Sequence, residues 1–331
     1  MKKSWIIWSL LGLVTLFVAS CKDDDEGPSD TEIVRARLEQ QIGEIQSFLA
    51  QQNIQAEEDS RGIFHQPLVL NPDGELVEEG DVALVHYKIS RLDGTLIAES
   101  RPGKPERITY SPNRRYFPIA IRYSLENVRV GEIHRYYVPS AYGYTSINRS
   151  YTDGERYQEF DNIILEMEIV DVYHSLEEIY EVEQADIQAW LQAEGSTSEE
   201  LPNGLHKIVL TAGSGEPPVN GDSVRVYYKG YFLDKQVFDE NTSGKGFGVK
   251  VGTTGLVTGF TQAIRTMQVG EKSLFILPSS LAYGSGQTSR GAFVLPKEDL
   301  AAFKEQNFLK DVSEIPPFST LIFEIELLSK K

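Results

Sequence analysis

The sequence predicts an α+β protein made of two tandem domains, each an antiparallel twisted sheet wrapped over a short helix and preceded by an N-terminal helix. Three observations lead to this prediction. The chain has 331 residues, which is enough for two hydrophobic cores. Its second half repeats motifs of its first half, and much of it alternates apolar and polar residues. An apolar content of 40% and an aromatic content of 10% favour a folded chain over a disordered one.

The two halves carry the same motifs in the same order. The interval from residues 45–49 (IQSFL) to 187–191 (IQAWL) equals the interval from Gly62 to Gly204. The next two matches shift by one position: 85–88 (VHYK) with 226–229 (VYYK), and 141–143 (AYG) with 282–284 (AYG). We therefore predict two copies of one domain, over residues 31–174 and 175–331. The second copy is longer before its last strand, which predicts a long loop insertion near residues 285–314.

Each copy begins with a predicted helix. Ser29 with Glu32, and Ser175 with Glu178, have the spacing of a capping box. Apolar residues then recur at helical intervals at positions 34, 38, 42, 45 and 49, so we expect each helix to pack on its own domain. A shorter helix is predicted after Thr258, a favourable N-cap residue, with an apolar face made of Phe260, Ile264 and Met267.

Strands are predicted over much of the rest. Val224, Val226 and Tyr228 alternate with polar or amphipathic residues, and the apolar positions 323, 325 and 327 alternate with Glu324 and Glu326. This alternation is typical of an antiparallel sheet with one buried face. Such a sheet closed over one short helix gives the α+β class.

The N-terminus has the features of an export signal. Residues 1–20 are predicted to be a lipoprotein signal peptide, because a basic start precedes an apolar stretch that is short for a transmembrane helix. The run 18–21 (VASC) resembles a bacterial lipobox, which makes Cys21 the acylated residue; the alternative is a free thiol after an ordinary secretory signal. Residues 21–30 form an acidic flexible tether, which resembles the export tag of Bacteroidota surface lipoproteins or is simply a solvated spacer. We expect an outer membrane lipoprotein at the cell surface or the periplasmic face.

Composition excludes several classes of function. A formal net charge of -17 without a basic run argues against nucleic acid as a partner. The five histidines are scattered and Cys21 is the single cysteine, so we expect no metal site and no disulfide within the chain. The glycine-rich stretch 244–248 (GKGFG) lacks a following Lys-Ser/Thr pair, which argues against a phosphate-binding loop. We expect no cofactor.

Residues 220–328 resemble the FKBP family of peptidyl-prolyl cis-trans isomerases in the content and the order of their motifs. The matching segments are 226–230 (VYYKG), 237–239 (VFD), 246–249 (GFGV), 256–260 (LVTGF), 267–271 (MQVGE), 281–284 (LAYG), 315–317 (IPP) and 320–328 (TLIFEIELL). The resemblance implies two tandem FKBP-like domains. It also implies a prolyl pocket in the second domain, whose substrate-binding residues are Phe238, Phe247, Leu256, Phe260, Ile315 and Phe323.

The resemblance further implies the catalytic groups Tyr228, Asp239, Val257 and Tyr283. The backbone N–H of Val257 would anchor a substrate carbonyl, and the Tyr283 hydroxyl would donate to the carbonyl that precedes proline. Asp239, oriented by the Tyr228 hydroxyl, would face the rotating carbonyl. Without the resemblance, burial of aromatic residues in a core and a turn role for Asp239 are the simpler interpretations.

The first copy keeps the scaffold residues Tyr87 and Tyr142 but changes the site. Ile97 and Ala98 stand at the positions of Phe238 and Asp239, and Glu106 and Arg107 stand near that of Phe247. Counting back from the shared Val-Gly pairs places Pro118 opposite Val257, and proline has no N–H to donate. We expect a degenerate, inactive first domain. In the second domain, Phe260 replaces the tryptophan of many family members, and the long insertion is expected to overhang the pocket.

We therefore predict a peptidyl-prolyl isomerase that acts on proline-containing segments of exported or surface proteins, with catalysis in the second domain and attachment to the membrane by a lipid. The alternative is a non-catalytic chaperone or assembly factor that uses the same pocket for recognition only. The Phe238–Asp239 pair favours catalysis, whereas Phe260 and the insertion favour recognition.

Overall fold

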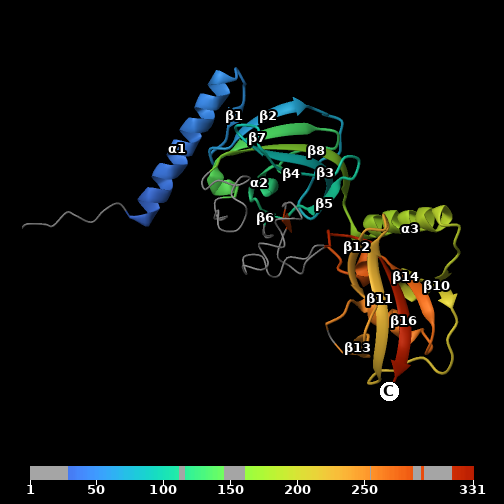
Figure 1. The fold of residues 1–331 in the computed structure, drawn as a ribbon. Helices are drawn as coiled ribbons and strands as arrows, with labels where there is room; N and C mark the ends of the chain where they lie inside the picture. The colour runs from blue at the N-terminus through green and yellow to red at the C-terminus, as the bar shows by residue number, and fades with distance from the viewer. Residues whose placement is uncertain (1–28, 112–115, 145–160, 254, 286–291, 294–314) are drawn as a thin grey trace, which may run out of the picture.

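In a computed structural model, the structure describes residues 29–111, 116–144, 161–253, 255–285, 292–293 and 315–331 (Figure 1). The predicted signal peptide, Cys21 and most of the tether lie outside these residues. So does most of the insertion expected to overhang the pocket. None of the described helices is long and apolar enough to cross a membrane.

The described part of the first domain is a seven-stranded antiparallel sheet with the helical segments α1, α2 and η1. Its strands follow the order β1-β2-β7-β8-β3-β4, and β5 also pairs with β3. Its elements are α1 (Asp30–Gln51), β1 (Glu57–Glu58), β2 (Phe64–Val69), β3 (Val82–Arg91), β4 (Leu96–Glu99), β5 (Glu106–Thr109), β6 (Tyr116–Phe117), α2 (Ala120–Tyr123), β7 (Ile133–Val138), η1 (Ser140–Tyr142) and β8 (Ile163–Tyr173).

The sheet of the second domain repeats the sheet of the first, strand for strand, when its order is followed from the opposite edge. Its sheet has the order β12-β11-β16-β14-β10-β9, with β13 paired to β11. Its elements are α3 (Leu176–Ala193), β9 (Glu199–Glu200), η3 (Pro202–Gly204), β10 (His206–Thr211), β11 (Ser223–Phe232), β12 (Val237–Asn241), β13 (Phe247–Lys250), α4 (Thr258–Arg265), β14 (Lys272–Leu277), η4 (Ser279–Leu281), β15 (Ala292–Phe293) and β16 (Leu321–Lys330). The predicted repeat and the α+β architecture are confirmed.

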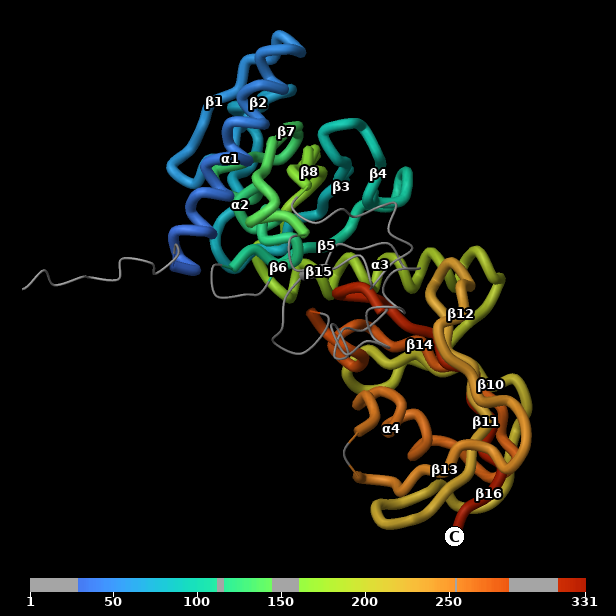
Figure 2. The backbone as a smooth tube through the Cα atoms, turned by 60° about the vertical axis from the view of Figure 1, so that its left-hand side comes forward, coloured from blue at the N-terminus to red at the C-terminus, as the bar shows by residue number. Residues whose placement is uncertain are grey.

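Each sheet curves around its short helix, as Figure 2 shows for α4. Alternate residues of the strands point inward, so Val224, Val226, Phe323, Ile325 and Leu327 are all buried in the core of the second domain. The apolar face of α4 lies against them through Phe260 and Ile264, which are 4% and 0% exposed. The sheet and the helix thus form one core that also carries the candidate site.

The leading helices pack on the outer side of each sheet. In α1, Ile45 and Leu49 bury against Phe64 and Tyr137, and the corresponding residues of α3 bury against Ile276 and Ile322. The capping box of α1 is present in full, because Ser29 and Glu32 bond each other's backbone N–H. At α3, Ser175 Oγ accepts from Glu178 N at 3.2 Å, whereas the Glu178 side chain accepts from His174 N.

One predicted detail differs in the structure, and another is confirmed and extended by it. Thr258 is the first residue of α4 and not its N-cap, because the extended backbone of Val257 (φ -62°, ψ 146°) takes the cap position. In addition, α3 does more than pack on its own domain. Its first turn lies at the junction of the two domains (Figures 1 and 2), where Ile179 contacts Val82 of the first domain.

Candidate active site

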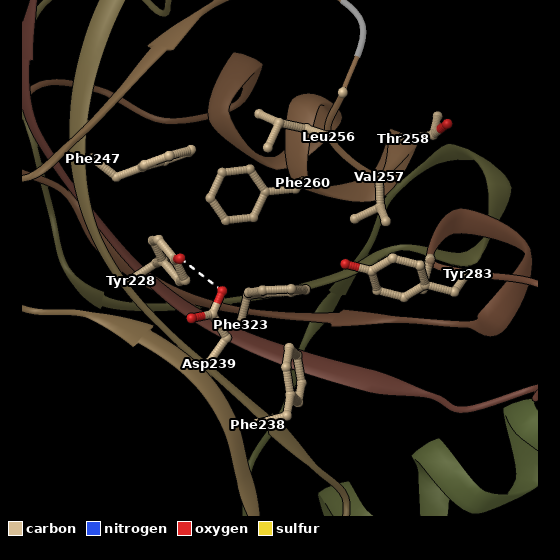
Figure 3. Close-up of a pocket in the computed structure, with 12 residues that line it drawn as sticks. Tyr228, Phe238, Asp239, Phe247, Leu256, Val257, Thr258, Phe260, Tyr283 and Phe323 are labelled. Atoms are coloured by element: carbon tan, nitrogen blue, oxygen red, sulfur yellow. Dashed lines mark hydrogen bonds between the residues drawn. The ribbon is translucent and has the colours of Figure 1, made fainter. Parts of the chain in front are cut away.

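A cavity of about 620 Å³ opens between the start of α4, the turn after η4 and the concave face of the second sheet (Figure 3). Nine of the ten site residues predicted in this domain line it. The exception is Ile315, which is buried in the same hydrophobic core but is not a lining residue. The lining residues are Tyr228, Phe238, Asp239, Phe247, Gly255, Leu256, Val257, Thr258, Phe260, Ala282, Tyr283 and Phe323.

The walls are aromatic rings held edge to face. The Tyr228 ring centroid lies 5.6 Å from that of Phe247 and 5.7 Å from that of Phe260, with interplanar angles of 73° and 84°. The Phe323 ring stands in the same way against Phe260 and Phe238, at 5.2 and 5.6 Å. Edge-to-face pairs at these separations are favourable, so each ring fixes its neighbour's orientation. The result is an apolar box of defined shape.

One polar pair stands at the rim of this box. The Tyr228 hydroxyl donates to Asp239 Oδ2 at 2.8 Å, as the dashed line in Figure 3 marks. Burial, and then this hydrogen bond, raises the pKa of Tyr228 to about 12. Because the hydroxyl keeps its proton at neutral pH, it holds the Asp239 carboxylate in one orientation.

Tyr283 enters from the opposite side. Its ring comes from the turn after η4, and its hydroxyl points toward the pocket centre (Figure 3). Burial raises the pKa of Tyr283, and the negative charge of Asp239 adds to the rise. The Tyr283 hydroxyl therefore remains a hydrogen-bond donor at neutral pH. The N-cap position puts the Val257 N–H at the start of α4, and among the described residues it donates to no backbone carbonyl.

Sequence reasoning missed the role of Gly230. In β11 this glycine pairs with Asp239 on one side and Phe323 on the other. A Cβ atom here would lie 2.5 Å from Phe238 Cζ, so the absent side chain provides the space that the Phe238 ring occupies. The strand register places Ile89 at this position in the first domain, where it is fully buried. Gly230 is the last residue of the segment 226–230 (VYYKG), and Ile89 stands at the matching position of the first copy. This Gly-to-Ile difference is the sequence feature that could have indicated the role of Gly230.

The strand registers also locate the site changes in the first domain. Ile89 pairs with Ala98 as Gly230 pairs with Asp239, so Ala98 takes the place of the carboxylate. Val85 pairs with Glu106 as Val226 pairs with Phe247, so Glu106 takes the place of that ring. The hydroxyl of Tyr87 accordingly donates to Glu106 Oε1, at 3.3 Å.

The turn before α2 completes the comparison. Ile121 N donates to Pro118 O at 3.2 Å, as Phe260 N donates to Val257 O at 3.1 Å, so Pro118 occupies the position of Val257. Pro118 follows a cis peptide bond and has no N–H. The side chains where a pocket would lie are buried in the first core: Tyr87, Ile97, Phe117 and Tyr144 are each 8% exposed or less.

No metal site competes with this interpretation within the part of the chain that the structure describes. Nowhere among those residues do three or more His, Cys, Asp or Glu side chains gather as a metal ion would require. Among the described residues, the cavity therefore offers apolar walls, the hydroxyls of Tyr228, Thr258 and Tyr283, the Asp239 carboxylate and the Val257 backbone N–H.

Comparison with known proteins gives a match to one family in both domains. The model of the FKBP-type peptidyl-prolyl cis-trans isomerase family matches residues 74–169 and 214–328. The FKBP-type 22 kDa peptidyl-prolyl cis-trans isomerase of Escherichia coli K12 is 36% identical over 135 residues, which is 41% of this chain and 53% of that protein. The isomerase FkpA of the same organism is 32% identical over 128 residues, 39% of this chain and 38% of that protein. The chain thus spans about half or less of the length of these relatives.

Solved structures of similar proteins include the three FKBP domains of wheat FKBP73, with a TM-score of 0.31, 22% identity, and coverage of 82% of this chain and 96% of that one. The structure of FkpA from Escherichia coli has a TM-score of 0.34 and 27% identity, and covers 47% of this chain and 62% of that one.

Proposed function

The chain belongs to the FKBP-type peptidyl-prolyl cis-trans isomerase family, and on that premise we propose that its second domain catalyses rotation about X–Pro bonds in polypeptides. The observation that carries the proposal is the cavity itself, where aromatic walls around about 620 Å³ meet the Tyr228–Asp239 pair at the rim. The family match supports the activity, and the position of the intact pocket supports its assignment to the second domain.

The proposed mechanism needs no nucleophile. The barrier to rotation is about 18–20 kcal/mol and comes from amide resonance, which is lost when the bond is twisted. A site that binds the twisted amide better than the planar one lowers this barrier, and each 1.36 kcal/mol of preference accelerates rotation about tenfold. The twisted amide has less charge separation than the planar one, so the apolar walls around Phe238, Phe260 and Phe323 favour it.

The polar groups orient the peptide in this scheme. The Val257 N–H anchors one substrate carbonyl, and the Tyr283 hydroxyl donates to the carbonyl before proline. Asp239, held by Tyr228, faces the carbonyl that rotates. Both hydroxyls are donors over the physiological pH range, because burial and Asp239 raise the pKa of each.

The first domain is proposed to be inactive. Ala98 supplies no carboxylate, Pro118 supplies no N–H, and Ile89 puts a side chain where Gly230 leaves room for the Phe238 ring that lines the cavity. These differences concern the three elements on which the proposed mechanism depends, namely the polar rim, the carbonyl anchor and the cavity.

The proposal extends to location and substrate. The short apolar start and the run ending in Cys21 support export and lipid attachment at the outer membrane. Proteins that reach the same compartment are then the proposed substrates, through their proline-containing segments.

Separate expression of residues 29–174 and 175–331 tests the assignment to the second domain. In a protease-coupled assay with a prolyl peptide, the second segment should be active and the first inactive. Comparable rates from both segments, or activity in the first alone, contradict the proposal. If the full chain binds the peptide at the cavity without accelerating rotation, the pocket serves recognition only, which is the rival function that Phe260 and the insertion favour.

A further inference from the structure

The two domains meet where β5 and the loop before it approach the second domain. Lys104 Nζ and Arg101 Nη1 lie 2.7 and 3.3 Å from Asp234 Oδ2, on the turn between β11 and β12. The side chains of both cations are about half exposed, at 51% and 54%. Exposed ion pairs add little stability and are weakened by salt. A fixed placement of the domains therefore depends on the buried contacts at the same junction.

Those buried contacts centre on Phe318. Its side chain is 2% exposed and packs with Val82 of β3 and Ile179 of α3 in one apolar cluster. Its backbone has φ of +53°, a region that a residue with a bulky side chain rarely adopts. A residue persists in such a conformation only when its surroundings hold it there.

The backbone of Phe318 is held on both sides, and the two sides belong to different domains. Arg107 Nη1, on β5 of the first domain, donates to Phe318 O at 2.8 Å. Phe318 N donates to Gly284 O, also at 2.8 Å. Gly284 directly follows Tyr283, the hydroxyl donor of the pocket. Two hydrogen bonds therefore lead from the first domain to the turn that carries Tyr283.

The same turn has a second support from α3. Ser279 N donates to Glu183 Oε2 at 3.0 Å, and Gly284 N donates to Ser279 O at 2.8 Å. Glu183 is 1% exposed. Burial raises the pKa of Glu183, while its hydrogen bond to Ser279 and the charge of Arg107 act in the opposite direction. Arg107 thus contacts the first support directly, through Phe318.

We propose that Arg107 of the first domain is a positioning residue for Tyr283 of the second domain, acting through the backbone of Phe318. The proposal rests on the function proposed above. It gives the first domain a specific role: having lost the groups of its own site, it supplies a cation that holds the neighbouring site in shape. Arg107 stands beside Glu106, which takes the position of the Phe247 ring, so this stretch of the first domain contacts the second domain instead of lining a pocket of its own.

The test compares variants of the full chain. Arg107→Ala removes the donor, Arg107→Lys keeps a cation and one donor, and Arg101→Ala is the matched control, since it cuts a contact across the same junction without touching the Tyr283 turn. With a prolyl peptide, Arg107→Ala should lower kcat about tenfold with little change in KM, the effect of a slightly misplaced catalytic group. Arg107→Lys should recover most of the loss, and Arg101→Ala should match the wild type.

A double-mutant cycle separates positioning from general destabilisation. In a Tyr283→Phe background, Arg107→Ala should cause no further loss, because the group it positions is already absent. Additive losses overturn the proposal and leave the isomerase function standing. If Arg107→Ala does not fold, Arg107→Gln takes its place in the cycle.

Amide hydrogen exchange provides a readout that needs no activity. Arg107→Ala should speed exchange at Phe318 N–H and Ser279 N–H about tenfold or more, while amides of the β11–β16 ladder stay protected. Unchanged exchange at both amides overturns the positioning role even if the wild-type chain proves inactive. An inactive wild type with the expected exchange would instead refute the proposed function and retain the structural coupling.

Discussion

The Val257 N–H can be removed with little other change, because the structure places this residue in a conformation that proline adopts. Val257 has φ of -62° and ψ of 146°, and proline requires φ near about -65°. Its N–H makes no backbone hydrogen bond among the described residues. Val257→Pro should therefore change the free energy of unfolding by less than about 1 kcal/mol.

The effect on activity follows from the single hydrogen bond that is lost. A neutral hydrogen bond has a net value of about 0.5–1.5 kcal/mol, which corresponds to about a twofold to twelvefold change in KM. An anchor on a non-rotating carbonyl is made equally in the planar and the twisted states. Hence KM should rise while kcat stays nearly constant.

The assay is steady-state isomerisation of a prolyl peptide by the full chain, with thermal unfolding in parallel. Val257→Ala is the matched control, because it shortens the side chain and keeps the N–H. The reasoning is refuted if Val257→Pro melts normally and has the wild-type KM, or if Val257→Ala loses as much as Val257→Pro.

Three further results are expected. Asp239→Ala should lower kcat/KM severalfold or more. Because Asp239 is exposed, the free energy of unfolding should change by no more than about 0.5 kcal/mol. An unchanged kcat/KM would show that Asp239 is not part of the site. Cys21→Ala should release the protein from the membrane fraction, and continued partitioning there without a lipid difference in mass contradicts the anchor. His174 lies 2.9 Å from Asp81 and 2.8 Å from Glu75, and these hydrogen bonds raise its pKa to about 9 from 6.5. The protonated His174 stabilises the fold fully below pH 6.5, and this stabilisation is lost as the pH rises through 9. The wild type should therefore melt at a higher temperature than His174→Gln at low pH, and this difference should shrink over that range. A difference that does not depend on pH contradicts the assignment.

Local and repeated features were predictable from the sequence. Alternation in β11 and β16 identified the strands, and the repeat aligned Tyr87 with Tyr228 and Tyr142 with Tyr283. The resemblance to the FKBP family then identified residues that line the cavity, whereas strand alternation alone indicates only which strand residues share a face.

Long-range contacts were not predictable in this way. Arg107 and Phe318 are 211 positions apart, and no periodicity links them. The buried ion pair between Lys207 and Glu271, at 2.8 Å, was likewise invisible, because each residue alone resembles an ordinary surface charge. The parallel pairing of β15 with β6 of the first domain depends on a tertiary arrangement that two residues cannot encode. Such contacts arise from the fold as a whole, and two of them, Arg107 with Phe318 and β15 with β6, join the two domains.

One pair of hydroxyl deletions tests the central claim most directly. Tyr228→Phe removes the donor to Asp239 in the second domain, and Tyr87→Phe removes the equivalent donor to Glu106 in the first. Measured as kcat/KM of the full chain on a prolyl peptide, Tyr228→Phe should lose activity about tenfold to a hundredfold, since a hydrogen bond to a charged group is worth about 1.5–3 kcal/mol. Tyr87→Phe should retain the activity. Equal losses in the two variants, or a loss confined to Tyr87→Phe, would contradict the assignment of catalysis to the second domain.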